Sequence, residues 1–371
     1  MKVKLIDITE NIFAGGDVPK DRFSEVVTDK YSIPVYANAE KDNGLYGYTD
    51  TARVSVPCVT VAARGTIGFV AKRMEPFLPV VRLITVIPSE EKITLDYLYY
   101  ALRNCKPKSS GTSIPQLTVP DIKNYSFEIV PIPRQEEITH ILDEVELLIK
   151  MQKEQIEEYN LLIKSRFVEM FGDPVSNPMG WEKKALKDVC KKLNDGTHFS
   201  PESFESGEYK YVTAKNIKLN GFDFSNITYV PEDVHRPIYE RCNPEFEDVL
   251  YIKDGVTTGI AMVNTLKEEF TLLSSVALLK QDRKIINGYF LCGVLNNEDM
   301  YTDIRSNMGG AAITRLTIAK LNGIKVIIPP IDLQNEFANF VKQVDKLKVA
   351  VQKSLDETQI LFDSLMQQYF G

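Results

Sequence analysis

The sequence of 371 residues has no long apolar run and few residues that could hold a metal ion. No stretch of roughly 18 or more apolar residues occurs, so no transmembrane helix is expected, and the polar start of the chain does not resemble a signal peptide. The five cysteines and three histidines are scattered without paired spacing. We therefore expect a cytoplasmic protein with reduced thiols, without a metal site and without a membrane.

The motifs that would indicate catalysis are also missing. The sequence contains no Gly-Lys dipeptide, which excludes a Walker phosphate loop, and no Gly-x-Ser-x-Gly nucleophile elbow. It also lacks an Asn-Pro-Pro-aromatic or Asp-Pro-Pro-aromatic segment, which an adenine N6-methyltransferase needs to hold the amino group. Asp173, Glu182 and Lys184 match a nuclease pattern only weakly. These absences predict that the chain is not an enzyme and binds no cofactor of its own.

The sequence instead contains one unit twice. A gap-free shift of 199 residues lays the end of the chain over its middle. The matching pairs are Gly111 with Gly310, Leu117 with Leu316, Thr118 with Thr317, Pro131 with Pro330, Ile132 with Ile331, Gln135 with Gln334, and Glu137 with Glu336. Because the register holds over about sixty positions, we infer a tandem duplication.

Each copy ends in a long segment that predicts a helix. After a proline-rich stop, roughly forty residues contain neither proline nor glycine until the last position. Large residues recur at alternating spacings of four and three, at Ile138, Leu142, Val145, Ile149, Ile156, Tyr159, Ile163 and Met170, and again at Phe337, Val341, Val344, Lys348, Leu355, Thr358, Phe362 and Tyr369. Such a seam favours an antiparallel coiled coil between the two copies, each about 55 Å long. Two separate amphipathic helices, each folded onto its own domain, are the alternative.

Between the helices the composition indicates mixed α and β structure. Short β-rich runs at 54–61 and 249–252 lead into glycine-centred turns, and short helices are expected at 95–104 and 289–295. These two segments align only loosely, and the growing shift between them indicates insertions in the second copy. The predicted fold is α+β, with globular domains at 1–130 and 173–328 and long helices at 131–172 and 329–371.

The net charge of −7 does not argue against nucleic acid once the charges are placed. The helical segment 134–172 has nine acidic and five basic residues, and the segment 332–371 has six and four. The helices therefore hold −6 of the −7, and the globular segments are nearly neutral with local basic clusters. Phosphate contact requires such local clusters rather than a basic protein.

The order of the motifs resembles a known family. The segments Gly-Thr-Ser-Ile-Pro-Gln-Leu-Thr at 111–118, Pro-Ile-Pro-Arg-Gln-Glu-Glu-Ile at 131–138 and Phe-Gly-Asp-Pro-Val-Ser-Asn-Pro-Met-Gly-Trp at 171–181 separate the globular and helical parts. This arrangement resembles the specificity subunit of type I restriction-modification systems, over the whole chain. One departure is that the start of the chain lacks the Gly-Trp found at 180–181.

The resemblance implies a non-catalytic subunit that reads an asymmetric bipartite DNA target. Each globular segment would be a target recognition domain, and the helices would space the domains and dock DNA adenine methyltransferase subunits. Through the complex, the chain would also meet restriction and motor subunits. S-adenosylmethionine, ATP and magnesium are implied for those partners and not for this chain.

Candidate DNA contacts are polar, aromatic and basic residues near predicted turns and strand ends. An asparagine can read adenine through two hydrogen bonds, which draws attention to Asn216 after its strand. The candidates are Lys20, Arg22, Asn38, Asn43, Tyr46, Tyr48, Arg64, Lys72, Arg73, Ser110, Thr112, Ser113, Thr197, His198, Thr213, Lys215, Asn216, Arg236, Thr257, Thr258 and Arg315.

Two other functions stay open at this point. A self-contained restriction and methylation enzyme would need the methyltransferase motif that the sequence lacks. A coiled-coil adaptor that holds other proteins would have the same helices but no affinity for DNA. Binding of the chain to randomised duplex distinguishes the adaptor from a DNA reader.

Overall fold

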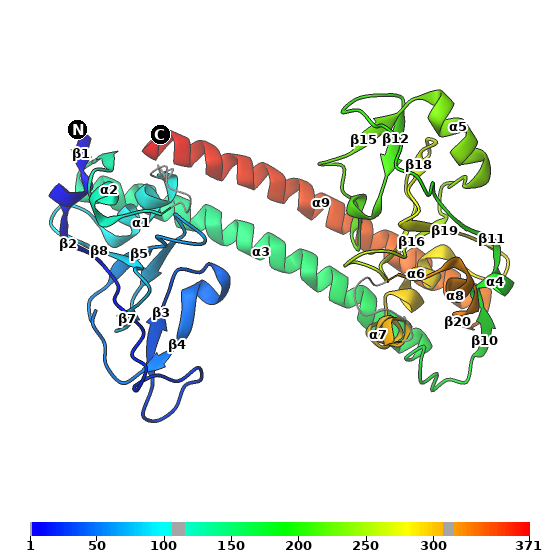
Figure 1. Ribbon diagram of the computed structural model, residues 1–371, viewed down its shortest axis with the longest axis horizontal. Helices are drawn as coiled ribbons and strands as arrows, with labels where there is room; N and C mark the ends of the chain where they lie inside the picture. The colour runs from blue at the N-terminus through cyan, green and yellow to red at the C-terminus, as the bar shows by residue number, and fades with distance from the viewer. Residues whose placement is uncertain (1, 106–115, 307–314) are drawn as a thin grey trace. The chain divides into compact units, whose positions relative to one another are not determined.

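The computed structural model describes residues 2–105, 116–306 and 315–371 (Figure 1). They form two compact units, Met1–Lys153 with Lys353–Gly371 and Glu154–Gln352. Each unit contains one globular segment and half of each of two 40-residue helices, α3 (Ile132–Phe171) and α9 (Ile331–Phe370). The predicted α+β class with two long helices is confirmed. None of the described helices is both long and apolar enough to span a membrane.

The first unit is built around two small sheets and a two-stranded ribbon of β1 and β9. The four-stranded sheet has the order β2-β8-β5-β6 and is antiparallel throughout, whereas the second sheet, β4-β3-β7, has one parallel pair. The strands are β1 (Lys2–Lys4), β2 (Thr9–Ala14), β3 (Ile33–Tyr36), β4 (Leu45–Thr49), β5 (Cys58–Val61), β6 (Val70–Arg73), β7 (Leu78–Pro79), β8 (Ile84–Pro88) and β9 (Ser126–Glu128), and the helices are η1 (Leu5–Ile8), η2 (Lys41–Gly44), α1 (Leu95–Asn104) and α2 (Val119–Lys123).

The second unit repeats this topology and adds a two-stranded sheet, β13-β14. Its four-stranded sheet is β11-β19-β16-β17, its three-stranded sheet is β15-β12-β18, and β10 pairs with β20 as β1 pairs with β9. The strands are β10 (Glu182–Ala185), β11 (Cys190–Asp195), β12 (Tyr209–Val212), β13 (Ile217–Lys218), β14 (Gly221–Phe222), β15 (Thr228–Val230), β16 (Val249–Ile252), β17 (Ala261–Val263), β18 (Thr271–Leu272), β19 (Val276–Gln281) and β20 (Lys325–Ile328). The shared topology confirms the duplication.

The second copy carries extra elements, as the growing sequence shift predicts. The connection from β4 to β5 spans 50–57, whereas the corresponding connection from β15 to β16 spans 231–248 and contains helix α5 (Glu232–Arg241). The other helices are η3 (Ala214–Asn216), α4 (Leu186–Val189), α6 (Gly288–Leu295), α7 (Glu298–Ser306) and α8 (Ile318–Gly323). The expected short helices at 95–104 and 289–295 correspond to α1 and α6.

Within the first unit the start of α3 lies against the end of α9. Gln152 donates to the Ser354 hydroxyl at 2.8 Å, and the ring of Phe362 on α9 packs 6.3 Å from that of Tyr100 on α1. Leu142, from the predicted seam, is fully buried. The two helices therefore run antiparallel here, and helix α1 contacts the pair with its aromatic side chains.

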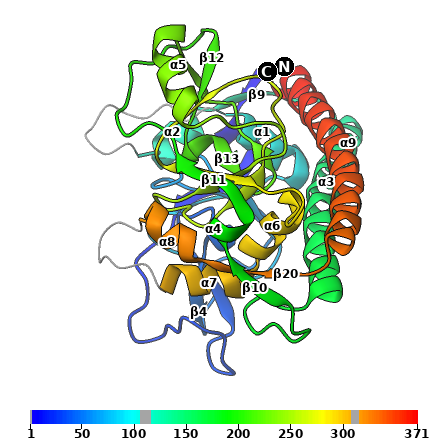
Figure 2. The ribbon, with the colours of Figure 1, turned by 90° about the vertical axis from the view of Figure 1, so that its right-hand side faces the viewer.

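Within the second unit the end of α3 lies against the start of α9 (Figure 2). The rings of Phe167 and Phe337 are 5.5 Å apart, and Arg166 donates to Glu336 at 3.1 Å. Helix α6 inserts Phe290 against Phe167 at 5.7 Å, in the place that α1 takes in the first unit. Gly293 permits this approach, because a Cβ there would lie 2.6 Å from the Phe167 ring. Both units thus have the predicted antiparallel pairing.

A buried glutamine ties the start of each long helix to its globular segment. Gln135 accepts from the Thr94 backbone N–H at 2.9 Å and donates to the carbonyls of Lys92 and Val130. Gln334 repeats the pattern with the Asn287 N–H at 2.9 Å and the carbonyls of Ile285 and Pro329. Backbone groups that would be unsatisfied at the edge of the core are paired in this way. The two residues are among those that the shift of 199 superimposes.

Cysteines introduced at Gln152 and Ser354 should cross-link within one chain, because their side chains touch across the antiparallel pair. The matched control places cysteines at Leu142 and Val341, which only a parallel pairing would bring together. Mass spectrometry after oxidation or a short bis-maleimide measures both products. Efficient cross-linking of the control pair would contradict the antiparallel arrangement.

Replacing Gln334 with leucine should lower the free energy of unfolding by about 1 to 3 kcal/mol, because the Asn287 N–H loses its buried acceptor. Gln343→Leu, on an exposed position of the same helix, is the control and should leave stability nearly unchanged. Chemical denaturation of the full chain measures both. Equal effects of the two changes would show that the buried hydrogen bonds contribute nothing.

Candidate nucleic-acid interface

Loops from both sheets meet beside the ends of β2 and β5 in the first unit, and of β11 and β16 in the second. We call these the first rim, residues 14–16, 62–66, 80–82 and 116–118, and the second rim, residues 195–198, 253–258, 273–275 and 315–317. In the first rim Gly16 bridges to Val80, and in the second Thr197 bridges to Leu273. The same backbone construction therefore exists twice.

Strand register makes the two rims comparable residue by residue. Ala14 and Val61 flank Ile84 in the first sheet, and Asp195 and Tyr251 flank Ala277 in the second. Two positions after Val61 and Tyr251, the Leu117 N–H donates to the Ala63 carbonyl at 3.0 Å and the Leu316 N–H donates to the Lys253 carbonyl at 2.8 Å. Ala14 thus corresponds to Asp195, Ala63 to Lys253 and Arg64 to Asp254.

The second rim contains a connected set of charges. Lys253 is 2% exposed, and its Nζ lies 3.4 Å from Asp195 Oδ2 and 3.0 Å from Asp254 Oδ2. Asp254 Oδ1 lies 3.3 Å from Arg315 Nε, and Asp195 Oδ1 lies 3.1 Å from His198 Nε2. Arg241 reaches the same Asp195 oxygen at 3.5 Å. The buried Asp195 and the partly buried Asp254 therefore lie among basic side chains, several of them exposed to solvent.

The first rim is simpler and still presents an arginine. Arg64 is exposed, and its Nε and Nη2 both donate to Gln116 Oε1, at 3.0 and 2.7 Å. The Asn38 amide closes this rim, because it accepts from the Ala63 N–H at 2.7 Å and donates to the Val81 carbonyl at 2.5 Å. Val81 has a positive φ of 52°, a conformation that a β-branched residue rarely adopts.

Several predicted contacts lie on the rims. Arg64, His198, Thr257 and Arg315 are exposed there, and Lys215 is exposed in the adjoining η3. The hydroxyls of Thr197, Thr213 and Thr258 instead bond to nearby backbone groups, with Phe199, Lys215 and Gly255 as their partners. Asn38 is similarly used within the protein. These four residues shape the rims, and their side chains are not free to read a base.

Asn216 also has a structural position, which corrects the idea that it reads adenine. It is buried, accepts from the backbone N–H and the hydroxyl of Thr213, both at 3.0 Å, and donates to the Asp223 carbonyl at 3.1 Å. A side chain that bonds inward in this way offers no free edge to a base. The sequence pattern located the end of the strand but not the direction of the amide.

Lys72 and Arg73 leave the candidate set for a similar reason. Lys72 Nζ bonds to Asp96 at 2.7 Å and lies 3.8 Å from Asp143 on α3. Burial acts to lower the pKa of Lys72, but the bond to Asp96 and the charge of Asp143 raise it overall. Arg73 is buried, bonds to Thr60 and stacks 3.6 Å from the centre of the Tyr36 ring. Both residues hold elements of the first unit together.

The remaining described candidates belong to neither rim. Lys20, Arg22, Asn43 and Tyr46 are exposed and Tyr48 is half-buried; Arg22 pairs with Asp50 at 2.8 Å, and Tyr46 packs on Phe23. Arg236 on α5 bonds to Glu232 and Glu269, and the bond to Glu232 raises its pKa. Ser110, Thr112 and Ser113 lie outside the described residues, so their predicted role is unchanged.

Sequence reasoning did not single out Asp195, Lys253, Asp254 or Gln116. A signal for the first two was present, since aligning the copies sets charged residues opposite Ala14 and Ala63. The pairing of Arg315 with Asp254 and of Arg64 with Gln116 has no such signal, because each joins residues far apart along the chain.

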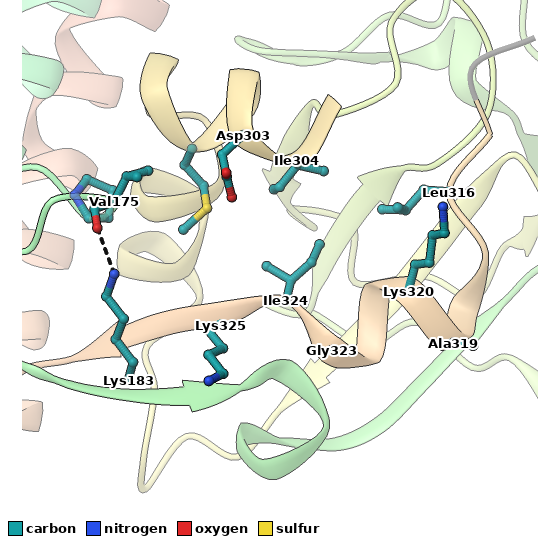
Figure 3. A pocket seen from close by; sticks show the side chains of 12 residues that line it. Val175, Lys183, Asp303, Ile304, Leu316, Ala319, Lys320, Gly323, Ile324 and Lys325 are labelled. Atoms are coloured by element: carbon teal, nitrogen blue, oxygen red, sulfur yellow. Dashed lines mark hydrogen bonds between the residues drawn. The ribbon is translucent and has the colours of Figure 1, made fainter. Parts of the chain in front are cut away.

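A cavity of about 500 Å³ lies beside the second rim, between the segment after α3, helices α7 and α8, and the ribbon β10-β20 (Figure 3). Its walls combine apolar side chains such as Ile304 and Ile324 with lysines. Lys183 donates to the Val175 carbonyl at 2.8 Å. Nothing in this lining resembles a nucleophile with its base. Across the described parts of the chain, no three His, Cys, Asp or Glu residues are grouped to hold a metal ion.

Comparison with known proteins identifies the family to which this architecture belongs. A family model described as the type I restriction modification DNA specificity domain matches residues 1–159 and 178–358. The chain belongs to this family. The two matched regions each contain one of the two rims and most of one long helix, which agrees with the tandem duplication.

Similar curated proteins are named as specificity subunits. A putative type I specificity subunit of Mycoplasma pneumoniae is 39% identical over 140 residues, which are 38% of this chain and 41% of the relative. The specificity subunit of the type I restriction enzyme MjaVIII of Methanocaldococcus jannaschii is 23% identical over 68% of this chain and 63% of its own length. The chain thus matches about two fifths of the first relative.

Solved structures share the fold. The type I restriction-modification S subunit of M. genitalium has a TM-score of 0.63 and 17% identity, over 100% of this chain and 96% of that one. A chain from a study of assembly and conformational transition in a type I system has a TM-score of 0.55 and 16% identity, over 100% and 97%. These likenesses support the fold and, at such low identity, the fold alone.

Replacing Asn216 with alanine should lower the free energy of unfolding by about 1 to 3 kcal/mol, because the Thr213 N–H loses its buried acceptor. Lys215→Ala, next to it and exposed, is the control and should leave stability unchanged. Thermal and chemical unfolding of the full chain measure both. An Asn216 variant of normal stability would return this residue to the set of possible base readers.

Proposed function

We propose that this chain is the DNA-reading, non-catalytic subunit of a type I restriction-modification complex in the cytoplasm. The observation that carries the proposal is the pair of rims, which have the same backbone construction but different side chains. Two recognition domains with the same backbone construction and different surface side chains suit a DNA target whose two halves differ in sequence. Membership of the DNA specificity family supports this assignment.

The rims have the chemistry for contact with duplex DNA. Arg64 in the first rim and Arg315 in the second carry guanidinium groups that can bond to phosphate oxygens or to two acceptors of a guanine. Lys215 and Arg241 add positive charge beside the second rim. The acidic excess of the chain resides mainly on α3 and α9, so it does not prevent local attraction of the DNA backbone.

The long helices have a repeated surface that suits protein partners. In the first unit Leu148, Ile360 and Leu361 are exposed, and in the second the equivalent residues Leu347, Leu161 and Leu162 are exposed, all between 46% and 69%. Apolar residues that recur on the outside of both units offer two similar docking sites. We propose that each binds one adenine methyltransferase subunit, through which restriction and motor subunits are recruited.

Catalysis is assigned to those partners. The methyltransferase would supply S-adenosylmethionine chemistry, and the motor and nuclease subunits would use ATP and magnesium. The role of this chain is to select where they act. Membership of the DNA specificity family supports this division of labour.

The exchange of one globular segment tests the reader function. Residues 182–328, from β10 to β20, are replaced with the matching segment of a relative, and the chain is produced with its methyltransferase in a host. Sequencing of methylated adenines should show that one half of a bipartite motif changes while the other half stays. A change in both halves would contradict independent readers, and absence of any motif with the unaltered chain would contradict the function.

The docking surface is tested with the double variant Leu162→Ser and Leu361→Ser. Because both side chains are already exposed, the fold should persist while co-purification of the methyltransferase falls at least tenfold. The control, Glu357→Ser, removes an exposed residue of α9 and should retain the partner. Normal recovery of the partner with the double variant would exclude these leucines from the interface.

A further inference from the structure

The second rim buries charges at positions where the first rim has alanine. Asp195 and Lys253 form a pair at 3.4 Å, and both are at least 97% buried. The residues in the corresponding places of the first unit are Ala14 and Ala63, and the latter is likewise buried. The same fold therefore forms with a buried ion pair in the second unit and without one in the first.

The comparison indicates that the fold does not require the ion pair. Transfer of two charges out of water is costly, and a well-packed apolar replacement is often as stable or more stable. The first unit has such a replacement. A costly pair that the fold can omit calls for another explanation, and its neighbours supply one.

Each of the two carboxylates that contact Lys253 also contacts an exposed arginine. Lys253 holds Asp254, whose Oδ1 faces the Nε of Arg315 at 3.3 Å, and the Arg315 side chain is 56% exposed. Within the described structure that buried Oδ1 has no aligned hydrogen bond, so the contact with Arg315 is its electrostatic partner. At the other end, Asp195 holds Arg241 at 3.5 Å.

The first rim obtains an exposed arginine in a different way. Arg64 stands where the second unit has Asp254, and Gln116 stands where it has Arg315. The two positions of this contact are therefore equivalent in both units, but the arginine occupies the first position in the first unit (Arg64) and the second position in the second unit (Arg315). On Gln116 an arginine is held by a neutral acceptor, whereas on Asp254 it is held by a carboxylate that needs a buried lysine behind it.

We propose that Asp195, Lys253 and Asp254 are positioning residues that hold Arg315 in place to contact DNA at the second half-site, and that Arg64 is the corresponding contact at the first. This inference rests on the proposed function as a DNA reader. It adds which residues determine specificity in each unit and why one unit contains a buried charge chain.

The decisive variant is Asp254→Asn in the full chain, purified with its methyltransferase. If Asp254 only repelled DNA, loss of its charge would tighten binding. If it positions Arg315, binding to a duplex with the methylated motif should weaken about tenfold, whereas binding to a duplex with a scrambled second half should change little. Their ratio, measured by fluorescence anisotropy at fixed salt, is the readout.

Arg315→Gln should reproduce that loss of binding. Arg315→Lys should bind more tightly than Arg315→Gln but less tightly than the unaltered chain. In the Asp254→Asn background, Arg315→Gln should cause little further loss of binding. The triple variant Asp195→Ala, Lys253→Ala and Asp254→Ala replaces the buried ion pair with the alanines found in the first rim and also removes the carboxylate that contacts Arg315, so it should fold and show the same loss. Arg64→Gln should reduce discrimination in the first half of the motif alone.

The outcomes separate this inference from the function beneath it. A wild-type complex that binds no duplex and methylates no motif would overturn the proposed function. A complex that methylates its motif while Asp254→Asn or Arg315→Gln leaves the binding ratio unchanged or raises it would overturn the inference alone. Circular dichroism of each variant establishes that a loss of binding is not a loss of fold.

Discussion

Both units depend on one constraint, which is that neither globular segment completes its core without both long helices. In the second unit Phe290 of α6 packs against Phe167 of α3, and Phe167 packs in turn against Phe337 of α9. In the first unit Tyr97 and Tyr100 of α1 meet Phe370 and Phe362 of α9. The antiparallel pairing is therefore part of each fold and not an attachment to it. This explains why the compact units contain halves of both helices.

The duplication preserves the contacts that carry this constraint and varies the rest. Gln135 and Gln334 repeat the same set of hydrogen bonds, because a backbone N–H at the edge of the core needs an acceptor in either copy. The rims carry no such requirement. Alanine, aspartate and lysine are all accommodated at equivalent strand ends, and the insertion with α5 extends only the second copy. A scaffold of this kind lets the surface chemistry of each unit change without altering the fold.

Acidic and basic residues are unevenly distributed along the chain, which the net charge of −7 does not show. The acidic excess lies mainly on the long helices, while exposed arginines stand on the rims. In the first unit Lys72 joins α1 to α3 through Asp96 and Asp143, so that part of the basic content is used for docking the helix. Basic residues thus have two different roles, and only their partners distinguish them.

The sequence by itself determined the duplication, the two long helices, their seam and the mixed α/β segments. These follow from local periodicity and from the register of the repeat, which need no knowledge of distant contacts. The sequence also indicated the family, through the order of its motifs. The domain boundaries that it suggested remain a prediction, because each long helix contributes to both compact units.

Only the tertiary structure decided which polar residues face outward. Asn216 and Thr213 lie together in the sequence pattern of a strand end, yet their side chains bond to each other and to the backbone. Asp195 and Lys253 meet because β11 and β16 both flank β19, and the pairing of Arg315 with Asp254 depends on a bridge between separate segments. Such contacts are set by strand register and by the cost of leaving a buried charge or polar group unpaired, and neither can be read from neighbours along the chain.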